Sequence, residues 1–353
     1  MLLLSKSREV NDMRKNVVGY IYFYIHFIVE VVCFFYLSRV TNNSLVVWFI
    51  PFIYDGLAFV PQSLIGYISD KNPKINMGIL GVICLMIAYL FFIFSNLICI
   101  SLIILCLGNC LLHVSGAEAT LKSSNGRLSP SAIFVAGGSF GVITGRLLAT
   151  TSLHPMFLMI PILSMIPFIL LSNIDIEDKT SADEFDYVHK KRNPYLVVFI
   201  AFLVVIIRGY MGYGIPTSWN KTIIQTIIFY FTMGIGKALG GILSDKFGIR
   251  KVAILSTLLA IPFLCFGDNH MMISLIGVMF FSMTMSITLA ILVSVLKKTP
   301  GLAFGITTIG LFLGTFPIFF IKVNMFVNIL IIIIFSCLCS FLLGYVLKGD
   351  AKK

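Results

Sequence analysis

The chain alternates between long apolar stretches and short polar ones, and the apolar stretches are long enough to cross a membrane. One helical crossing of the hydrocarbon core needs about 20 mostly apolar residues. Twelve stretches of roughly this length follow one another along the chain, covering residues 17–38, 45–68, 77–95, 97–117, 131–149, 156–173, 195–214, 222–243, 252–267, 271–295, 301–321 and 325–347. The pattern therefore predicts an all-α polytopic membrane protein with about twelve transmembrane helices.

The other architecture that spans membranes is a closed β-barrel, in which apolar and polar residues alternate over about ten positions. Residues 102–107 and 329–335 are instead continuous apolar blocks, so the spans are predicted as helices. Before the first span, only residues 2–4 form an apolar run. This run is too short for the hydrophobic region of a secretory signal, and we expect no cleaved signal peptide.

The charges are few and unevenly placed. The chain has 353 residues, of which 58% are hydrophobic and 12% charged, with a net charge of +11; a soluble domain carries about twice that charged fraction. With the N-terminus placed inside, 20 of the 26 Lys and Arg fall in inner segments, three in outer loops and three within spans. The positive-inside rule then places both termini in the cytoplasm. The basic balance reflects topology in the cytoplasmic membrane, and we expect no nucleic-acid partner.

The cysteines give no sign of a metal or redox site. All eight lie in or at the edges of apolar spans, without a Cys-x-x-Cys pair or an accompanying His cluster. Such cysteines behave as small apolar residues. We therefore expect no metal ligands among them, and no cofactor.

The chain divides into two halves that share a short motif. The longest internal polar stretch, residues 173–194, is predicted as a cytoplasmic linker between helix bundles at 1–172 and 195–353. Gly66 to Lys71 recurs as Gly241 to Lys246, each copy ending an even-numbered span at an offset of 175 residues. A glycine lets helices approach closely, and an Asp followed by basic residues at the helix end can pair across a cytoplasmic seam.

This repeated motif is the signature of the major facilitator superfamily, Gly-x-x-x-Asp-Arg/Lys-x-Gly-x-Arg/Lys after the second and eighth helices, and the chain resembles that family over its whole length. The second copy matches closely, with Gly248, Arg250 and Lys251 in register; the first copy has Pro73 where the family has glycine. The resemblance implies two six-helix bundles and a cytoplasmic gate formed by Gly66, Asp70, Lys71, Gly241, Asp245, Lys246 and Arg250.

Within the superfamily, several segments resemble the fosmidomycin-resistance group of drug efflux proteins. The carrying residues are His26, Phe27 and Glu30 in the first span, Gln62 with Gly66, the run 113–117, Gly137, Gly138, Gly141 and Gly145, and Ile207 with Arg208. The resemblance implies proton-coupled export by antiport. Two departures weaken that implication: Val114 follows His113 where the group has proline, and Arg146 replaces the proline that ends the glycine-rich stretch.

Ionisable residues within spans are functional candidates because placing them in a membrane costs at least a few kcal/mol. Glu30 lies past the midplane of the first span with His26 one turn away on the same face, and Asp55 lies in the second span. We expect these three to carry coupling protons, with a fixed ion pair as the alternative for Glu30. Arg208, Arg146, His113 and Gln62 are expected to contact substrate, Arg208 through the paired donors of its guanidinium.

Two transport hypotheses remain open: proton-coupled export of a small organic molecule, and uptake of an anionic metabolite attracted by Arg208 and Arg146. No phosphate-binding Gly-x-x-x-x-Gly-Lys-Ser/Thr loop occurs in the sequence, so a transporter of this kind would use an ion gradient. A membrane enzyme or sensor is a third reading. Neither His26 with Glu30 nor His113 with Glu118 has the His-Glu-x-x-His spacing of a zinc site, so no catalytic residue and no metal site is predicted, and we expect a monomer.

Overall fold

The structure is a computed structural model that describes residues 2–41, 49–95, 97–174, 182–321 and 323–349, with side chains described from residue 17 onward except at 173–174. Part of the predicted linker (173–194) and the basic side chains that precede the first span lie outside the described residues. Twelve spans are long and apolar enough to cross a membrane. The chain is therefore a multi-pass membrane protein, and the predicted twelve-helix class is confirmed.

The described elements are all helical apart from one isolated bridge between Val188 and Leu347. In chain order the helices are α1 (Leu2–Thr41), α2 (Phe49–Phe59), α3 (Gln62–Lys71), α4 (Met77–Phe94), α5 (Ile98–Ser123), α6 (Ser129–Ala149), η1 (Pro155–Leu158), α7 (Met159–Ile174), α8 (Pro194–Gly214), α9 (Ile223–Phe247), α10 (Ile249–Phe266), α11 (Met271–Ser282), α12 (Thr284–Val295), α13 (Pro300–Thr315), η2 (Phe316–Phe319) and α14 (Met325–Val346).

Several predicted spans are built from two pieces. The second span consists of α2 and α3, which are separated at Val60 and Pro61, and Pro61 precedes the first turn of α3. Proline has no N–H to donate to the preceding turn, so a helix breaks or restarts there. The tenth span is likewise divided at Met283 into α11 and α12. The count of spans is as predicted, but their continuity is not.

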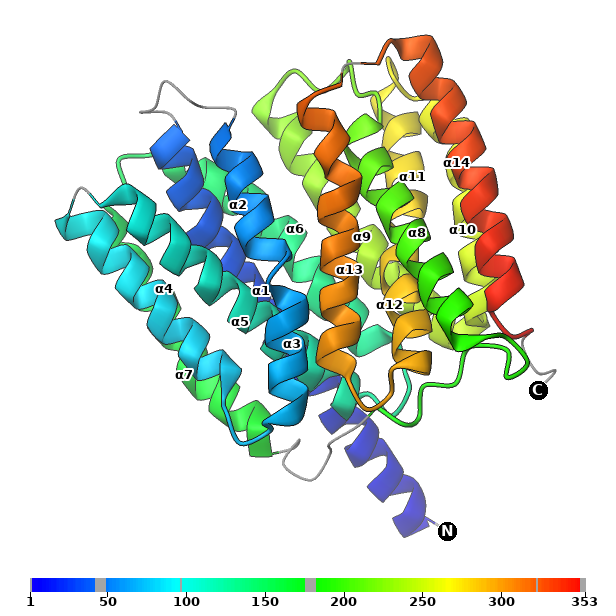
Figure 1. Cartoon of the computed structure of the whole chain (residues 1–353), viewed down its shortest axis with the longest axis horizontal. Coiled ribbons are helices and arrows are strands. Elements are labelled where there is room, and N and C mark those ends of the chain that lie inside the picture. Colours follow the sequence, from blue (N-terminus) through cyan, green and yellow to red (C-terminus); the bar gives the residue numbers. More distant parts are fainter. Residues whose placement is uncertain (1, 42–48, 96, 175–181, 322, 350–353) are drawn as a thin grey trace.

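Two groups of helices lie side by side (Figure 1). Helices α1 to α7, with η1, form one group, which we call the N-terminal bundle; helices α8 to α14, with η2, form the C-terminal bundle. The start of α1 and the end of α14 lie toward the same edge of the molecule (Figure 1), as an even number of spans requires. We call that face the inner face; it is the face that the basic loops predict to be cytoplasmic. The residue boundaries of the bundles stay predictions.

The two bundles meet mainly along two helix pairs, α3 against α13 and α6 against α9, and α13 also contacts α2 and α5. A repeat-motif glycine lies in each of the two main contacts. A Cβ on Gly66 would overlap the backbone of Gly301, and a Cβ on Gly241 would overlap the side chain of Ala132. Only glycine allows helices to come this close, which gives a packing reason for the glycine in both copies of the motif.

The second half of the predicted linker runs along the inner face. The backbone N–H of Ala182 donates to the carbonyl of Lys297 over 2.9 Å. Asp186 forms an ion pair with Lys348, and the Tyr187 hydroxyl donates to the carbonyl of Gly126 in the N-terminal bundle. This part of the linker therefore contacts the inner ends of both bundles.

Candidate functional site

Three of the predicted polar residues meet inside the N-terminal bundle. Glu30 and His26 come from successive turns of α1, and His113 comes from α5. The Nε2 atom of His113 lies 3.2 Å from Oε1 of Glu30, and the Nε2 atom of His26 lies 3.7 Å from the same oxygen. The two Nε2 atoms are 2.9 Å apart. We call these three residues the His–Glu triad.

Neighbouring backbone fixes both imidazole rings. Nδ1 of His26 is 2.8 Å from the carbonyl oxygen of Phe134 on α6, and Nδ1 of His113 is 2.9 Å from the carbonyl of Asn109, one turn earlier on α5. The rings stand edge to face with centroids 4.5 Å apart. Each member of the triad is at most 8% exposed, so the orientation of these groups is set by protein contacts and not by water.

Glycines of α6 make room for the triad beside α1. A Cβ on Gly138 would strike the His26 ring, and one on Gly141 would strike the Cβ of Glu30 and the backbone of Phe27. These glycines belong to the stretch that resembles the export motif. Here their role is steric: they let α6 approach α1 closely enough for the carbonyl of Phe134 to reach His26.

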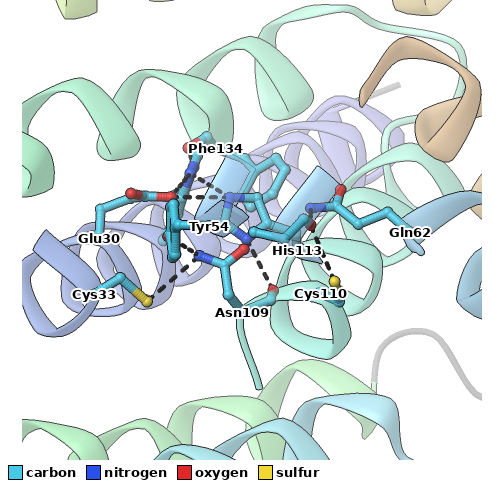
Figure 2. A network of polar contacts seen from close by, with 10 residues as sticks. Glu30, Cys33, Tyr54, Gln62, Asn109, Cys110, His113 and Phe134 are labelled. Atoms are coloured by element: carbon cyan, nitrogen blue, oxygen red, sulfur yellow. Dashed lines mark hydrogen bonds and ion pairs between the residues drawn. The ribbon is translucent and has the colours of Figure 1, made fainter. Parts of the chain in front are cut away.

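A second polar layer surrounds the triad (Figure 2). The amide of Asn109 donates to the Tyr54 hydroxyl over 3.0 Å and lies 3.5 Å from the Cys33 sulfur. In Figure 2, Gln62 lies on the opposite side of His113 from Glu30. Its amide donates to the carbonyl of Ala58, and its buried Oε1 accepts no hydrogen bond from any residue that the structure describes.

The sequence reasoning missed Asn109 and Tyr54. Asn109 is fully buried within an apolar span, and a lone amide in such a span is itself a signal, because it must find a partner there. Tyr54 gives no comparable signal, since Tyr also occurs as an apolar filler. Their hydrogen bond links α5 to α2, so this layer fixes the helices that carry His113 and Asp55.

Asp55 lies apart from the triad. Its carboxylate is 9% exposed and has no hydrogen bond or ion pair with the residues that the structure describes. Glu30, Arg146, Tyr213 and Cys106 lie within electrostatic range of it. The structure thus places Asp55 near the predicted coupling residues without joining it to them.

The three cations within the spans have different surroundings. Arg146 is exposed and lies over Phe34 of α1 and Tyr230 of α9, at 5.2 and 5.6 Å from the ring centroids, so it reaches across the two bundles. Lys237 on α9 lies within electrostatic range of Glu30 and of Arg208. None of these cations forms an ion pair within the described part of the chain.

Arg208, expected to contact substrate, lies among helices of the C-terminal bundle. Its guanidinium lies 5.4 Å from the ring centroid of Phe281, and it lines a small pocket inside the C-terminal bundle with Thr257, Thr284 and Ser336. Its Nε–H donates to no residue that the structure describes. The hydroxyl-bearing residues of this pocket come from other helices of the same bundle, which sequence position alone does not place. A substrate contact for Arg208 stays a prediction.

Among the side chains that the structure describes, the gate aspartates Asp70 and Asp245 form no ion pair with a basic residue; each accepts backbone N–H groups from the opposite bundle. Asp70 accepts from Gly301 and Leu302 at the start of α13, over 3.1 and 2.9 Å. Asp245 accepts from Leu128 and Ser129 at the start of α6, over 2.8 and 2.9 Å. Helix N-termini offer unpaired N–H groups and partial positive charge, so each carboxylate joins the bundles at the inner face.

The basic residues of the motif lie near these caps without contributing to them. Lys71 lies 5.7 Å from the ring centroid of Tyr67, and Lys246 lies 5.2 Å from that of Phe247. Arg250 is next to Gly349 near the end of the chain. Glu118 is buried and bonded to Lys122 over 2.9 Å.

Comparisons with known proteins give the fold a class. No family model and no curated protein matches the chain. Solved structures do match. The human organic anion transporter MFSD10 (TETRAN) aligns with a TM-score of 0.59 at 12% identity, over 93% of this chain and 99% of the other. The major facilitator superfamily transporter FucP in its outward conformation aligns with a TM-score of 0.58 at 13% identity, over 92% and 99%.

The chain therefore has the fold of the major facilitator superfamily transporters. The fold class predicted from the repeated motif is confirmed. The finer resemblance to the fosmidomycin-resistance group, and the roles assigned to individual site residues, stay predictions.

Proposed function

We propose that the chain is a secondary transporter that moves a small organic anion across the cytoplasmic membrane by alternating access. The fold supports the first part, because transporters of this architecture bind substrate near the bilayer midplane between their repeats and rock the bundles around that site. The positive charges within the spans support the proposal that the substrate is an anion.

The main evidence for an anionic substrate is the excess of unpaired cationic side chains within the spans. Arg146, Arg208 and Lys237 have no carboxylate partner within the described part of the chain. Glu118 is occupied by Lys122, and Glu30 is held by two imidazoles. A cation within a membrane span is costly without a counter-ion, and Arg208 and Lys237 are half-buried there. An anionic ligand would supply that counter-ion, with Lys237 and Arg146 as first contacts and Arg208 behind them.

One structural relative agrees with this reading. The solved structure with a TM-score of 0.59 is described as an organic anion transporter. At 12% identity this likeness concerns the fold, so it supports the proposal only alongside the charges. Export of a drug-like molecule, which the fosmidomycin-resistance resemblance implied, remains the second candidate, and the exposed Arg146 argues for an anion within that candidate too.

Coupling to protons is assigned to Asp55. A buried carboxylate with no hydrogen bond or ion pair is costly to keep ionised. Protonation removes that electrostatic cost. Binding of a cation beside the carboxylate would remove it too. The groups that surround it are Glu30, Arg146, Tyr213 and Cys106. Protons entering with the anion would drive uptake, and protons entering as it leaves would drive export.

The proposal is tested by binding. The detergent-purified protein is heated with mono-, di- and tricarboxylates and organic phosphates, and with sugars and amines of similar size. Anions should raise the unfolding temperature, and Lys237→Gln should remove the shift. Lys221→Gln is the matched control, since Lys221 is exposed just before α9. Stabilisation by amines or sugars alone would contradict the proposal.

A further inference from the structure

We propose that the His–Glu triad is a binding site for a transition-metal cation of the Zn²⁺ type. The ligand atoms are Nε2 of His26, Nε2 of His113 and Oε1 of Glu30, contributed by α1 and α5. They are the three His, Cys, Asp or Glu donors that come together in the described part of the chain, all within 4.8 Å of one another. The sequence analysis predicted no metal site, and the two histidines are 87 positions apart in the chain.

The hydrogen bonds of the rings decide which nitrogen carries the proton. A carbonyl oxygen only accepts. Nδ1 of His26 faces the carbonyl of Phe134 and Nδ1 of His113 faces that of Asn109, so each Nδ1 must be the N–H donor. In the neutral imidazole the other nitrogen is then bare. Both Nε2 atoms therefore present lone pairs to each other and to Glu30.

Three acceptor atoms that face one another within 3.7 Å repel unless a cation lies among them. A proton on one Nε2 relieves this repulsion along one line at a time. A metal ion relieves it for all three atoms together, because each lone pair then points at the same centre. The arrangement favours an ion with three ligand bonds over a shared proton.

The spacing of the three atoms matches a metal in tetrahedral geometry. Zinc–nitrogen and zinc–carboxylate bonds of 2.0–2.2 Å place neighbouring ligand atoms about 3.3 Å apart. The observed separations are 2.9, 3.2 and 3.7 Å, which bracket this value. Two imidazoles with one carboxylate and an open fourth position are a usual donor set for Zn²⁺ and for Fe²⁺. Ca²⁺ and Mg²⁺, which prefer oxygen ligands, are disfavoured.

The surroundings resemble those of known metal sites. Histidines that bind metals normally donate their second ring N–H to a carbonyl or carboxylate, which fixes the tautomer and the ring orientation. Both triad histidines do so. The side chains keep 7–9% of their surface exposed, so the site is enclosed but not sealed. Phe304 of α13 lies almost parallel to the His113 ring, which places the triad beside the C-terminal bundle.

The inference goes beyond anion transport and does not depend on it, since a metal can bind whether or not an anion moves. The test uses Co²⁺, which absorbs visible light when bound in tetrahedral geometry. Full-length protein in detergent is stripped with a chelator, titrated with Co²⁺ and then with Zn²⁺. We expect one Co²⁺ per chain, with visible bands that one equivalent of Zn²⁺ abolishes, since Zn²⁺ binds such sites more tightly.

Variants separate ligation from structure. His113→Gln and Glu30→Gln should each weaken Co²⁺ binding by about 100-fold or more, beyond the 10–100-fold typical of the residues that support ligands. His154→Gln is the matched control, because His154 is exposed at the start of η1. His113→Cys should retain the metal and add a sulfur-to-metal band in the near ultraviolet, which no structural role produces.

His113→Cys keeps the experiment decisive even if His113→Gln does not fold. The absence of visible bands from the wild-type protein would overturn the proposal, and the triad would then share protons only. Bands of equal strength in wild type and His113→Gln would also overturn it, because the metal would be bound elsewhere.

Discussion

The charged residues inside the two bundles differ in sign and in how far neighbouring residues pair with them. In the N-terminal bundle, Glu30 is within 3.7 Å of both histidines, and each histidine is tied to a backbone carbonyl. In the C-terminal bundle, Arg208 and Lys237 have no carboxylate partner within the described residues. The first arrangement offers three donor atoms that suit a small cation; the second offers positive charge that suits an anion. The ligand that a polar residue in a membrane span can bind is thus indicated by the charge or hydrogen-bonding capacity that its neighbours leave unpaired.

The largest effect should follow from removing a C-terminal cation. Lys237→Gln should weaken anion binding about 30-fold or more, because truncating one partner of a buried charge pair costs about 2–5 kcal/mol. Isothermal titration with the best anion from the binding panel measures this. Lys221→Gln should bind as the wild type does. Equal affinities for both variants would mean that Lys237 does not face the substrate.

Asp55→Asn should separate coupling from substrate movement. Vesicles that contain this variant should not accumulate or expel the anion under a pH gradient, because the side chain can no longer gain and lose a proton. Exchange of labelled for unlabelled anion at equal pH should continue. Reversing the gradient in wild-type vesicles distinguishes symport from antiport. Gradient-driven flux that persists in Asp55→Asn would remove this residue from the coupling step.

The two gate aspartates should have similar and smaller effects. Asp70→Ala and Asp245→Ala each remove a carboxylate that accepts two backbone N–H groups of the opposite bundle. Each should destabilise the protein by about 1–3 kcal/mol, the cost of leaving such donors unpaired. Thermal unfolding in detergent compares them, with Lys71→Ala as the neighbouring control. A loss from one aspartate alone would show that the repeat is not equivalent in the two halves.

The smallest effect concerns the linker. The Lys348 ammonium holds the pKa of the Asp186 carboxyl below its usual range. A carboxyl whose pKa is lowered on folding stabilises the fold above its unfolded pKa of about 3.9, and that contribution disappears as the pH falls through the lower, folded value. The carboxylate is half exposed, so Asp186→Asn should cost less than about 1 kcal/mol at pH 7. Limited proteolysis of the linker at pH 7, compared with Lys190→Gln, measures it.

Much of the fold was predictable because each span must carry its own apolar length. The twelve stretches and the repeated motif follow from local composition, and the linker position stays a prediction. The break at Pro61 could have been predicted from proline alone, whereas the break at Met283 has no local signal. The capping role of Asp70 and Asp245 depends on which helix ends face them. Neither copy of the motif predicts which helices pack together.

The individual residues of the candidate site could be identified from the sequence, but which of them lie together could not. Glu30 and His26 share a helix face, so their proximity follows from helix geometry. His113 joins them only because α6 approaches α1 at its glycines and α5 packs beside both. Arg208 could be placed within a span from the sequence, but which neighbours its side chain meets depends on helix packing. Distances between helices come from packing, which one sequence does not reveal.

Flux of an organic anion tests the central claim most directly. Purified protein is reconstituted in vesicles, and entry of the labelled anion that binds best is followed in wild type, Lys221→Gln and Lys237→Gln. The account predicts saturable entry in the first two, and entry close to that of protein-free vesicles in Lys237→Gln. Entry at the protein-free rate in wild-type vesicles, with binding intact, would contradict it.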